Sequence, residues 1–454
     1  MTRFFRHKNF YKRTWLALIG SAFLFVHPMG LTQSEDSNAF SALVRNLVTQ
    51  IEQPQYATSF DQLRKFVTAS YLEAPGYITT LYQLKALESQ IEAAESGYYP
   101  TVQIQGAAGR RYTNSQAFPD NNYALTAQQT LYSFGATEAT IGIATAKSDA
   151  GKVRIDDTRA KVVLDMVVAV LEYQRAKRNV AFTQGFLVSQ KDFVEKIRQR
   201  VELGASSEFD LRRSQEKLGN TTKKILAAQE QLRLAAAGYK SWFSYEPQFN
   251  DLVFRTPQVP NDSLSSEEAV ANHPDVREAT SNYQAAIASL ARHDAMQFGE
   301  IALTYEYSKT DINGATGKWG STVGVIYSNT VFDGFLGKST RSGLVAAREE
   351  SLSKKLAAER EVEREISSAV TSLERFMAEL AIQIQAVNGQ LAIEETSREL
   401  FLLGRASLTD VFDSQEDTLN QGLELSNVLH EQQVAFLRNL YIRQKILKIF
   451  ERAV

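Results

Sequence analysis

Cysteine is absent from the 454-residue chain, and proline and histidine are scarce, with nine and five residues respectively. Without cysteine there is no disulfide framework, no thiolate metal site, no cysteine nucleophile and no lipid attached through a cysteine. The formal net charge is only −2, so we expect no nucleic acid partner, whose binding would depend on neutralising phosphates. The scarcity of proline leaves long stretches rich in Ala, Glu, Gln, Leu, Lys and Arg, which favours helices over a compact mixed fold.

Recognisable clusters of catalytic residues are also missing. The spacing of the histidines does not match a metal-binding motif, and no glycine loop of the phosphate-binding type precedes a helix. No serine has a nearby histidine that would activate it as a nucleophile. We therefore expect a protein that is not an enzyme and that has no catalytic residue, metal site or cofactor. The histidines are His7, His27, His273, His293 and His430.

Residues 1–30 have the composition of a secretory signal peptide. Five Lys and Arg residues and no acid occur in the first 13 positions, and an apolar run follows over 15–26. A membrane anchor is the alternative, although this run is shorter than the roughly 20 apolar residues that span a bilayer. The cleavage position stays open, because no clean pair of small residues follows Val26. We expect the chain to be exported.

One sequence pattern occurs twice, 200 positions apart. Residues 203–216 and 403–416 are identical at seven of 14 positions, including Gly204 and Gly404. Shared helical composition does not explain so many matches, so we predict a tandem duplication. The predicted units are a first repeat at 31–265, which ends in a proline-containing linker at 245–265, and a second repeat at 266–454.

Alternating apolar and polar residues predict one β-hairpin in each repeat, over 101–133 and 300–333. The polar segments 113–122 and 311–318 are expected to be their loops. Each strand has about ten residues, the length that a tilted transmembrane strand needs. Surface hairpins of a soluble protein are the alternative. Four strands cannot close a membrane barrel, since the smallest have about eight, so the membrane hypothesis requires an oligomer.

Proline-free helical segments follow the hairpins, over 136–203 and 336–403. Apolar residues recur in them every seven positions, which predicts coiled-coil packing. Glu394 is the one polar residue at such a position in the second segment. A continuous helix of this length would extend over roughly 100 Å, far more than a globular core can use.

The repeated pattern is expected at the tips of two helical hairpins. Gly204 and Gly404 end the long helices, and Ser207 and Ser407, each followed by an acid, begin new ones. The predicted helical hairpins are 136–242 and 336–450.

The order of helix, β-hairpin, long helix, tip and return helix in both halves resembles the TolC family of bacterial outer-membrane efflux proteins, over about 77–451. The motifs that carry the resemblance are Gly97-Tyr98-Tyr99-Pro100 before the first hairpin, 131–135 and 331–334 at the ends of the hairpins, and the two tips. The resemblance implies a mainly α fold with a transmembrane β-barrel. Four strands per chain would complete a 12-stranded barrel in a homotrimer, and a long coiled-coil helical barrel would extend into the periplasm.

The resemblance also implies a function. The trimer would be a channel-tunnel in outer membrane lipid, through which an inner-membrane transporter and a periplasmic adaptor (membrane fusion) protein export small molecules or proteins. Multidrug efflux and type I secretion are both compatible with the sequence. A periplasmic coiled-coil scaffold without channel activity is the alternative, but a scaffold does not need ten-residue strands in both halves.

The tips are the candidate entrance gate. Asp410 and Asp413 are three residues apart and share one helical face. In a trimer each would form a ring of three acids, which favours cations, and family members have acids at the same place. Alternatively, the acids only complement the helix dipole, which explains Asp410 and Asp210 equally well but not Asp413.

The resemblance further implies a closed-state contact, in which a Tyr and an Arg near the second tip hold the acid of the first. Here Phe401 occupies the Tyr position and has no hydroxyl, and Ala406 occupies the Arg position. Arg405 precedes it by one residue and is expected to reach Asp210 from there. How the closed state is held stays open.

Overall fold

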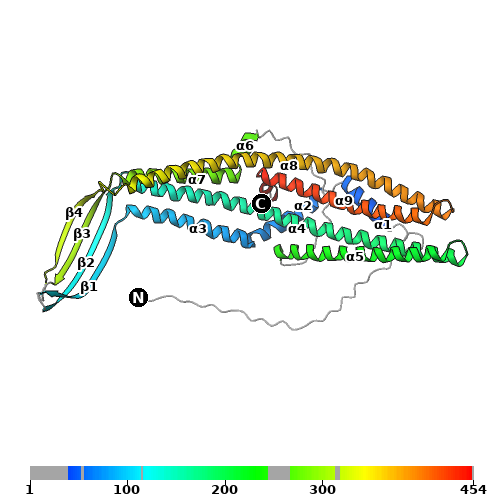
Figure 1. The fold of residues 1–454 in the computed structure, drawn as a ribbon, viewed down its shortest axis with the longest axis horizontal. Coiled ribbons are helices and arrows are strands. Elements are labelled where there is room, and N and C mark those ends of the chain that lie inside the picture. The colour runs from blue at the N-terminus through cyan, green and yellow to red at the C-terminus, as the bar shows by residue number, and fades with distance from the viewer. Residues whose placement is uncertain (1–38, 53–55, 114–115, 244–265, 312–316, 452–454) are drawn as a thin grey trace.

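The structure is a computed structural model that describes residues 39–52, 56–113, 116–243, 266–311 and 317–451. The signal peptide predicted at 1–30 and the linker predicted at 245–265 lie outside these residues. The described part is elongated, with a β-sheet at one end and two helical tips at the other (Figure 1).

The four strands form one antiparallel sheet in the order β1-β2-β3-β4. The two predicted hairpins join because β2 pairs with β3, for example Ala127 with Tyr305. The outer strands β1 and β4 each have a strand neighbour on one side only, within the described residues. The strands are β1 (Thr101–Thr113), β2 (Gln116–Tyr132), β3 (Glu300–Asp311) and β4 (Gly320–Ser328).

The loop predicted at 113–122 is wrong for most of its length, because β2 already begins at Gln116. The polar residues and Pro119 suggested a loop, yet they pair with β1, Pro119 opposite Arg110. Among the described residues, 116–120 of β2 pair with β1 only, since the pairing of β2 with β3 ends at Asn121 and Asp311. A proline is tolerated in this singly paired part of a strand. Of the second predicted loop, 312–316 lie outside the described residues.

Two long helices and two return helices form most of the body. α4 (Ala136–Glu202) and α8 (Leu336–Leu402) each have 67 residues, and α5 (Glu208–Trp242) and α9 (Leu408–Ile442) each have 35. Their starts and turns agree with the predicted helical hairpins.

The residues that recur every seven positions are turned inward, as coiled-coil packing requires. Met166 and Leu373 are 0% and 1% exposed. Glu394 is buried too, at 4% exposure. Burial raises the pKa of the Glu394 carboxyl above its usual value, and the charge of Arg398, whose Nη1 lies 3.9 Å away, opposes the rise. The predicted seam is therefore a packed interface that includes one acid.

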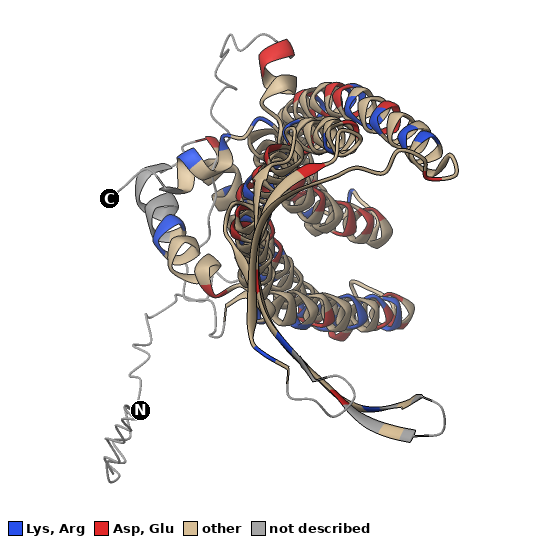
Figure 2. Cartoon of the chain, turned by 90° about the vertical axis from the view of Figure 1, so that its left-hand side faces the viewer, with Lys and Arg blue, Asp and Glu red and all other residues tan. Residues whose placement is uncertain are grey.

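The helices lie side by side in a single curved layer. α4 is central: it packs against α3 (Pro75–Glu95) and α7 (Pro274–Met296) toward the sheet, and against α5 and α9 toward the tips. α8 packs against α7 and α9. Seen along the long axis, the layer is an arc that stays open on one side (Figure 2).

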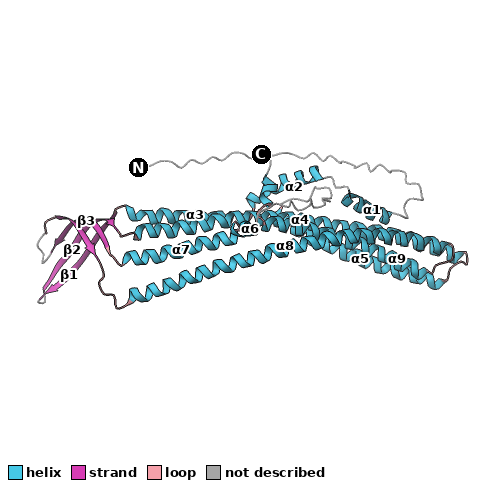
Figure 3. Ribbon diagram, turned by 90° about the horizontal axis from the view of Figure 1, so that it is seen from above, coloured by secondary structure: helices cyan, strands magenta, loops and turns pink. Residues whose placement is uncertain are grey.

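Two short helices, for which the sequence suggested no role, cover one side of the arc near its middle (Figure 3). They are α1 (Ala39–Glu52) and α2 (Tyr56–Ser70). Phe40 of α1 contacts Phe186 of α4 edge to face, with ring centroids 5.5 Å apart. Gly185 of α4 and Gly422 of α9 permit this approach, since an added Cβ at either would lie 3.1–3.2 Å from an α1 side chain.

The second return helix is shorter than predicted, because it ends at Ile442 instead of continuing to 450. The amides of Gln444 and Lys445 donate to the carbonyls of Tyr441 and Leu440 at 2.9 and 2.8 Å, and Gln444 has a φ of +55°. This cap contains no glycine, so no local pattern predicted it. The chain then turns into α10 (Ile446–Glu451), which buries Phe450 in the core.

Three further short elements are η2 (Tyr71–Glu73), η3 (Ser96–Tyr98) and α6 (Ser266–Ala271). Among the described helices, none combines the length and the apolar composition that crossing a membrane requires.

Candidate functional site: the helical tips

Both tips have the same backbone geometry. Gly204 and Gly404 each have a φ of +70°, a conformation that residues with a Cβ rarely adopt. The Gly204 amide donates to the Val201 carbonyl at 2.9 Å, and the Ala205 amide donates to the Arg200 carbonyl at 2.7 Å. The same two bonds recur 200 residues later, at 2.9 and 2.8 Å. This is a Schellman motif, which satisfies the last carbonyls of each long helix.

We expect Gly404→Ala to lower the free energy of unfolding by about 1–2 kcal/mol, because the left-handed conformation strains a Cβ. No atom lies within 4 Å of the position that this Cβ would take, so the loss is purely conformational. The matched control is Gly389→Ala in the middle of α8, which has equally open space. It should raise the stability by roughly 0.5–1 kcal/mol. Denaturant unfolding of the two variants should thus give effects of opposite sign, and equal signs would contradict the prediction.

Asp210 and Asp410 cap the return helices. Ser207 accepts a hydrogen bond from the Asp210 amide at 3.1 Å, and the Ser207 amide donates to the Asp210 carboxylate at 3.1 Å. Ser407 and Asp410 form the same reciprocal pair. Hydrogen bonds from the side chain and backbone of Ser407 lower the pKa of the Asp410 carboxyl. The helix-terminus interpretation therefore accounts for both of these acids.

Asp413 has no capping role. Its side chain is 61% exposed, and the nearest cation is Nζ of Lys217 on α5, 3.9 Å away. One turn further along α9, Glu416 lies 3.2 Å from Lys217 and 2.7 Å from Lys224. Contact with Lys224 and Lys217 lowers the pKa of the Glu416 carboxyl, which is thus held ionised. Within the described residues, Asp413 is thus an acid near the second tip with no capping role and no ion pair shorter than 3.9 Å.

The contacts between α5 and α9 form a polar ladder, with the basic residues on α5 and the acids on α9. Besides the ion pairs, Nη1 of Arg213 donates to the Thr409 hydroxyl at 2.8 Å. We call this set the tip ladder; it consists of Arg213, Lys217, Lys224, Thr409, Asp413 and Glu416.

An apolar cluster joins the two hairpins just above the tips. Phe193 of α4 contacts Phe401 of α8 and Phe412 of α9 edge to face, with ring centroids 5.6 and 5.5 Å apart. The guanidinium carbon of Arg200 lies 5.0 Å from the centre of the Phe401 ring. Phe401 therefore joins the two hairpins of this chain by packing. We call this set the tip cluster; it consists of Phe193, Ile197, Phe401, Leu408, Val411 and Phe412.

Arg405 is exposed at the second tip, while the Asp210 carboxylate is bonded to Ser207. Within the described part of this one chain, no ion pair joins the two residues. The contact of Arg405 with Asp210 stays a prediction, which an assembly of several chains would test.

Sequence reasoning missed the tip ladder and the aromatic partners of Phe401. Lys217 and Lys224 are seven residues apart and face an acid on the other return helix. The two lysines and the acid are visible in the sequence, but the sequence does not say which helices are neighbours, so their pairing could not be predicted.

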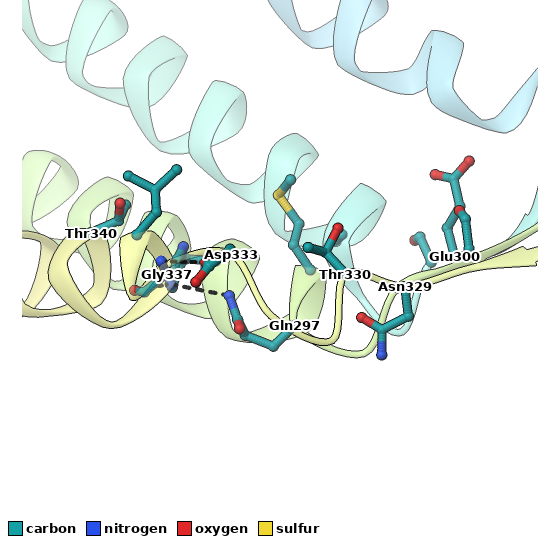
Figure 4. A pocket seen from close by; sticks show the side chains of 14 residues that line it. Gln297, Glu300, Asn329, Thr330, Asp333, Gly337 and Thr340 are labelled. Atoms are coloured by element: carbon teal, nitrogen blue, oxygen red, sulfur yellow. Dashed lines mark hydrogen bonds between the residues drawn. The ribbon is translucent and has the colours of Figure 1, made fainter.

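The other prominent feature is a cavity of about 550 Å³ at the junction of the sheet and the helices, near the start of α8 (Figure 4). Asp333 accepts a hydrogen bond from the Gly337 amide, and Nε2 of His293 lies 3.0 Å from the Gly337 carbonyl oxygen. A Cβ at Gly337 would lie 2.8 Å from the Asp333 carboxylate. These contacts fix the start of α8, so His293 packs against the backbone here.

Residues 80–238 match the family model of the outer membrane efflux proteins. The match covers 159 of the 454 residues, so about a third of the chain is similar to this family. No curated protein sequence matches the chain.

Solved structures of several membrane proteins share the fold over most of the chain. A structure of CusC is 15% identical and has a TM-score of 0.75, covering 86% of this chain and 92% of its own. VceC of Vibrio cholerae is 16% identical with a TM-score of 0.74, covering 84% and 96%. The CmeC channel of Campylobacter jejuni is 12% identical with a TM-score of 0.75, covering 87% and 91%.

Proposed function

We propose that three copies of this efflux protein form a channel-tunnel through which an inner-membrane transporter and a periplasmic adaptor export small molecules or proteins. The observation that carries the proposal is the two-sided character of the sheet. One row across the four strands is apolar or aromatic, and the next row is polar. The first consists of Val102, Ala127, Tyr305 and Val323, and the second of Gln103, Thr126, Glu306 and Thr322.

Alternation of this kind is typical of a barrel wall with lipid on one side and water on the other. The outer strands β1 and β4 support the trimer, because unpaired backbone groups are costly in lipid. Three four-stranded sheets joined edge to edge would give a 12-stranded barrel. The same three-fold arrangement would close the open arc of helices into a tunnel.

The two halves support the proposed tandem duplication. Each contains a strand pair, a 67-residue helix, a glycine turn and a 35-residue helix. We assign 31–265 and 266–454 to the two repeats on this basis.

We assign the periplasmic entrance gate to the tips. The tip cluster and the tip ladder hold the second hairpin against the first within one chain. In the trimer, three copies of Asp413 would converge at the mouth and favour cations. Gly204 and Gly404 give the tips their shape, and we retain Arg405 as the residue that would contact Asp210 in the closed state.

The tips also offer a surface for the periplasmic adaptor. Leu203 is 83% exposed, and Leu403 and Phe209 are each 69% exposed. Large apolar side chains exposed at the end of a structure are typical of a protein interface.

The test is to purify the mature chain in detergent, determine its mass, and record currents in a planar bilayer. We expect a trimer that forms narrow, cation-preferring channels. A monomer that stays in solution without detergent and gives no conductance would support the coiled-coil scaffold instead. A pull-down of inner-membrane proteins with the assembled trimer would then identify the transporter.

A further inference from the structure

Two helices, α7 and α8, bring together a histidine and two carboxylates near the middle of the helical layer, far from the tips. His273 immediately precedes α7, Asp275 lies in its first turn, and Glu365 lies on α8. One ligand atom from each lies within 4.8 Å of the others. Asp157 of α4 is close enough for its charge to interact with His273 and Asp275. These residues come from both repeats, so the spacing of histidines along the sequence could not reveal them.

The buried histidine has an unsatisfied ring atom. His273 is 3% exposed, and its Nδ1 accepts the Asp275 amide hydrogen over a long 3.3 Å. Its Nε2 has no hydrogen-bond partner among the described residues. A buried polar atom without a partner is costly and requires an explanation.

Within the described part of the chain, no Lys or Arg forms a direct ion pair with the carboxylates of Asp157, Asp275 or Glu365, although the charge of Lys161 acts on Asp157. Asp157 accepts a hydrogen bond from the Tyr441 hydroxyl at 2.8 Å. Burial raises the pKa of Tyr441, and the charges of Asp157, Asp275 and Glu365 raise it further. This cluster therefore carries an excess of negative charge beside a buried imidazole.

We propose that His273, Asp275 and Glu365 bind a divalent transition-metal cation, with Zn²⁺ as the best match. Imidazole together with carboxylates is a ligand set that Zn²⁺ accepts, whereas Mg²⁺ and Ca²⁺ take oxygen ligands alone. Coordination through Nε2 would place the ring proton on Nδ1, which would then lose the long hydrogen bond from the Asp275 amide.

The bound cation would connect α7 to α8 beside α4. Because α7 and α8 are adjacent in the arc, such a cross-link would stiffen the middle of the helical layer without touching the tips. Zinc would thus act as a structural element and not as a catalyst.

The test uses the full mature chain in detergent, without a polyhistidine tag, after removal of metals with EDTA. Titration with ZnCl₂ in a calorimeter should show one saturable site per chain. Glu365→Gln and His273→Asn should each weaken binding at least about tenfold, since even substitutions around metal ligands cost that much. Asn is a strong helix N-cap, so His273→Asn should preserve the start of α7 while removing the imidazole.

The matched control is Glu363→Gln, an exposed acid two residues away on α8, which should bind like the unmodified chain. Co²⁺ gives a second readout, because its visible absorption changes when a nitrogen ligand is lost. Circular dichroism checks that the variants are folded. Absence of saturable Zn²⁺ binding, or equal affinity of Glu365→Gln and Glu363→Gln, would overturn the proposal. Neither result would affect the conductance expected of the channel.

Discussion

Replacement of Phe412 by alanine is expected to lower the free energy of unfolding by about 3–5 kcal/mol, the usual loss for a buried phenylalanine. The ring is 1% exposed and packs against Phe193 of the other repeat. Phe412 lies four residues into α9, where its removal leaves a cavity directly above the tips. The second hairpin would then be held against the first mainly by the tip ladder. Exposed ion pairs contribute little, roughly 0–1 kcal/mol each.

A second consequence is expected in the assembled channel. If the tip cluster holds the entrance closed, Phe412→Ala should increase the time that single channels spend in the open state in a planar bilayer. Denaturant unfolding in detergent measures the first effect, and single-channel recording measures the second.

The matched control for this variant is Phe209→Ala, which makes the same change at the first tip. Phe209 is 69% exposed, so its stability should change by no more than about 0.5 kcal/mol. Equal effects of the two substitutions would show that the tip cluster does not hold the hairpins together.

Asp413→Asn is expected to weaken the cation preference of the channel. In water, the interaction energy between a unit charge and an ion about 4 Å away is roughly 1 kcal/mol, and the energies of the three symmetric carboxylates add. The ratio of cation to anion permeability should therefore fall by about fivefold or more at low salt, and by less at high salt because of screening. Reversal potentials in a salt gradient measure this ratio.

The structure makes the single Asp413 variant more informative than a double change with Asp410. Asp410 caps α9 through Ser407, so its substitution alters both charge and helix start. Asp149→Asn, on the sheet-proximal half of α4, is a control for charge removal at a distance from the mouth. Unchanged selectivity in Asp413→Asn would mean that the acids of the second tip serve the helix terminus only.

The sequence was sufficient to predict the long helices and the two glycine turns, because the seven-residue repeat and the glycines are local signals. The starts of α4 and α8 and the positions of Gly204 and Gly404 agree with the prediction. The cap at Gln444 was missed because it contains no glycine. The strand residues 116–122 were missed because their polar composition is typical of loops, whereas pairing with β1 decides their conformation.

The candidate site was predictable only in part, for a related reason. The spacing of Asp410 and Asp413 predicted that both belong to the site. Their hydrogen-bond and ion-pair partners show that the two acids have different roles. Asp410 contacts Ser407 within its own turn, whereas Asp413 approaches Lys217 of a helix almost 200 residues away. Contacts between distant helices depend on how the arc is packed, which no local pattern encodes.

The unequal length of the two hairpins shapes the outer rim of the proposed barrel. β1 and β2 continue past the end of β3 for the five residues 116–120 of β2, which is roughly 16 Å of strand. With three-fold symmetry, three long β1–β2 pairs would alternate around the rim with three shorter β3–β4 pairs. The ends of the β1–β2 pairs would then project farthest from the proposed barrel on the outside of the cell, where an antibody or a bacteriophage would contact them first.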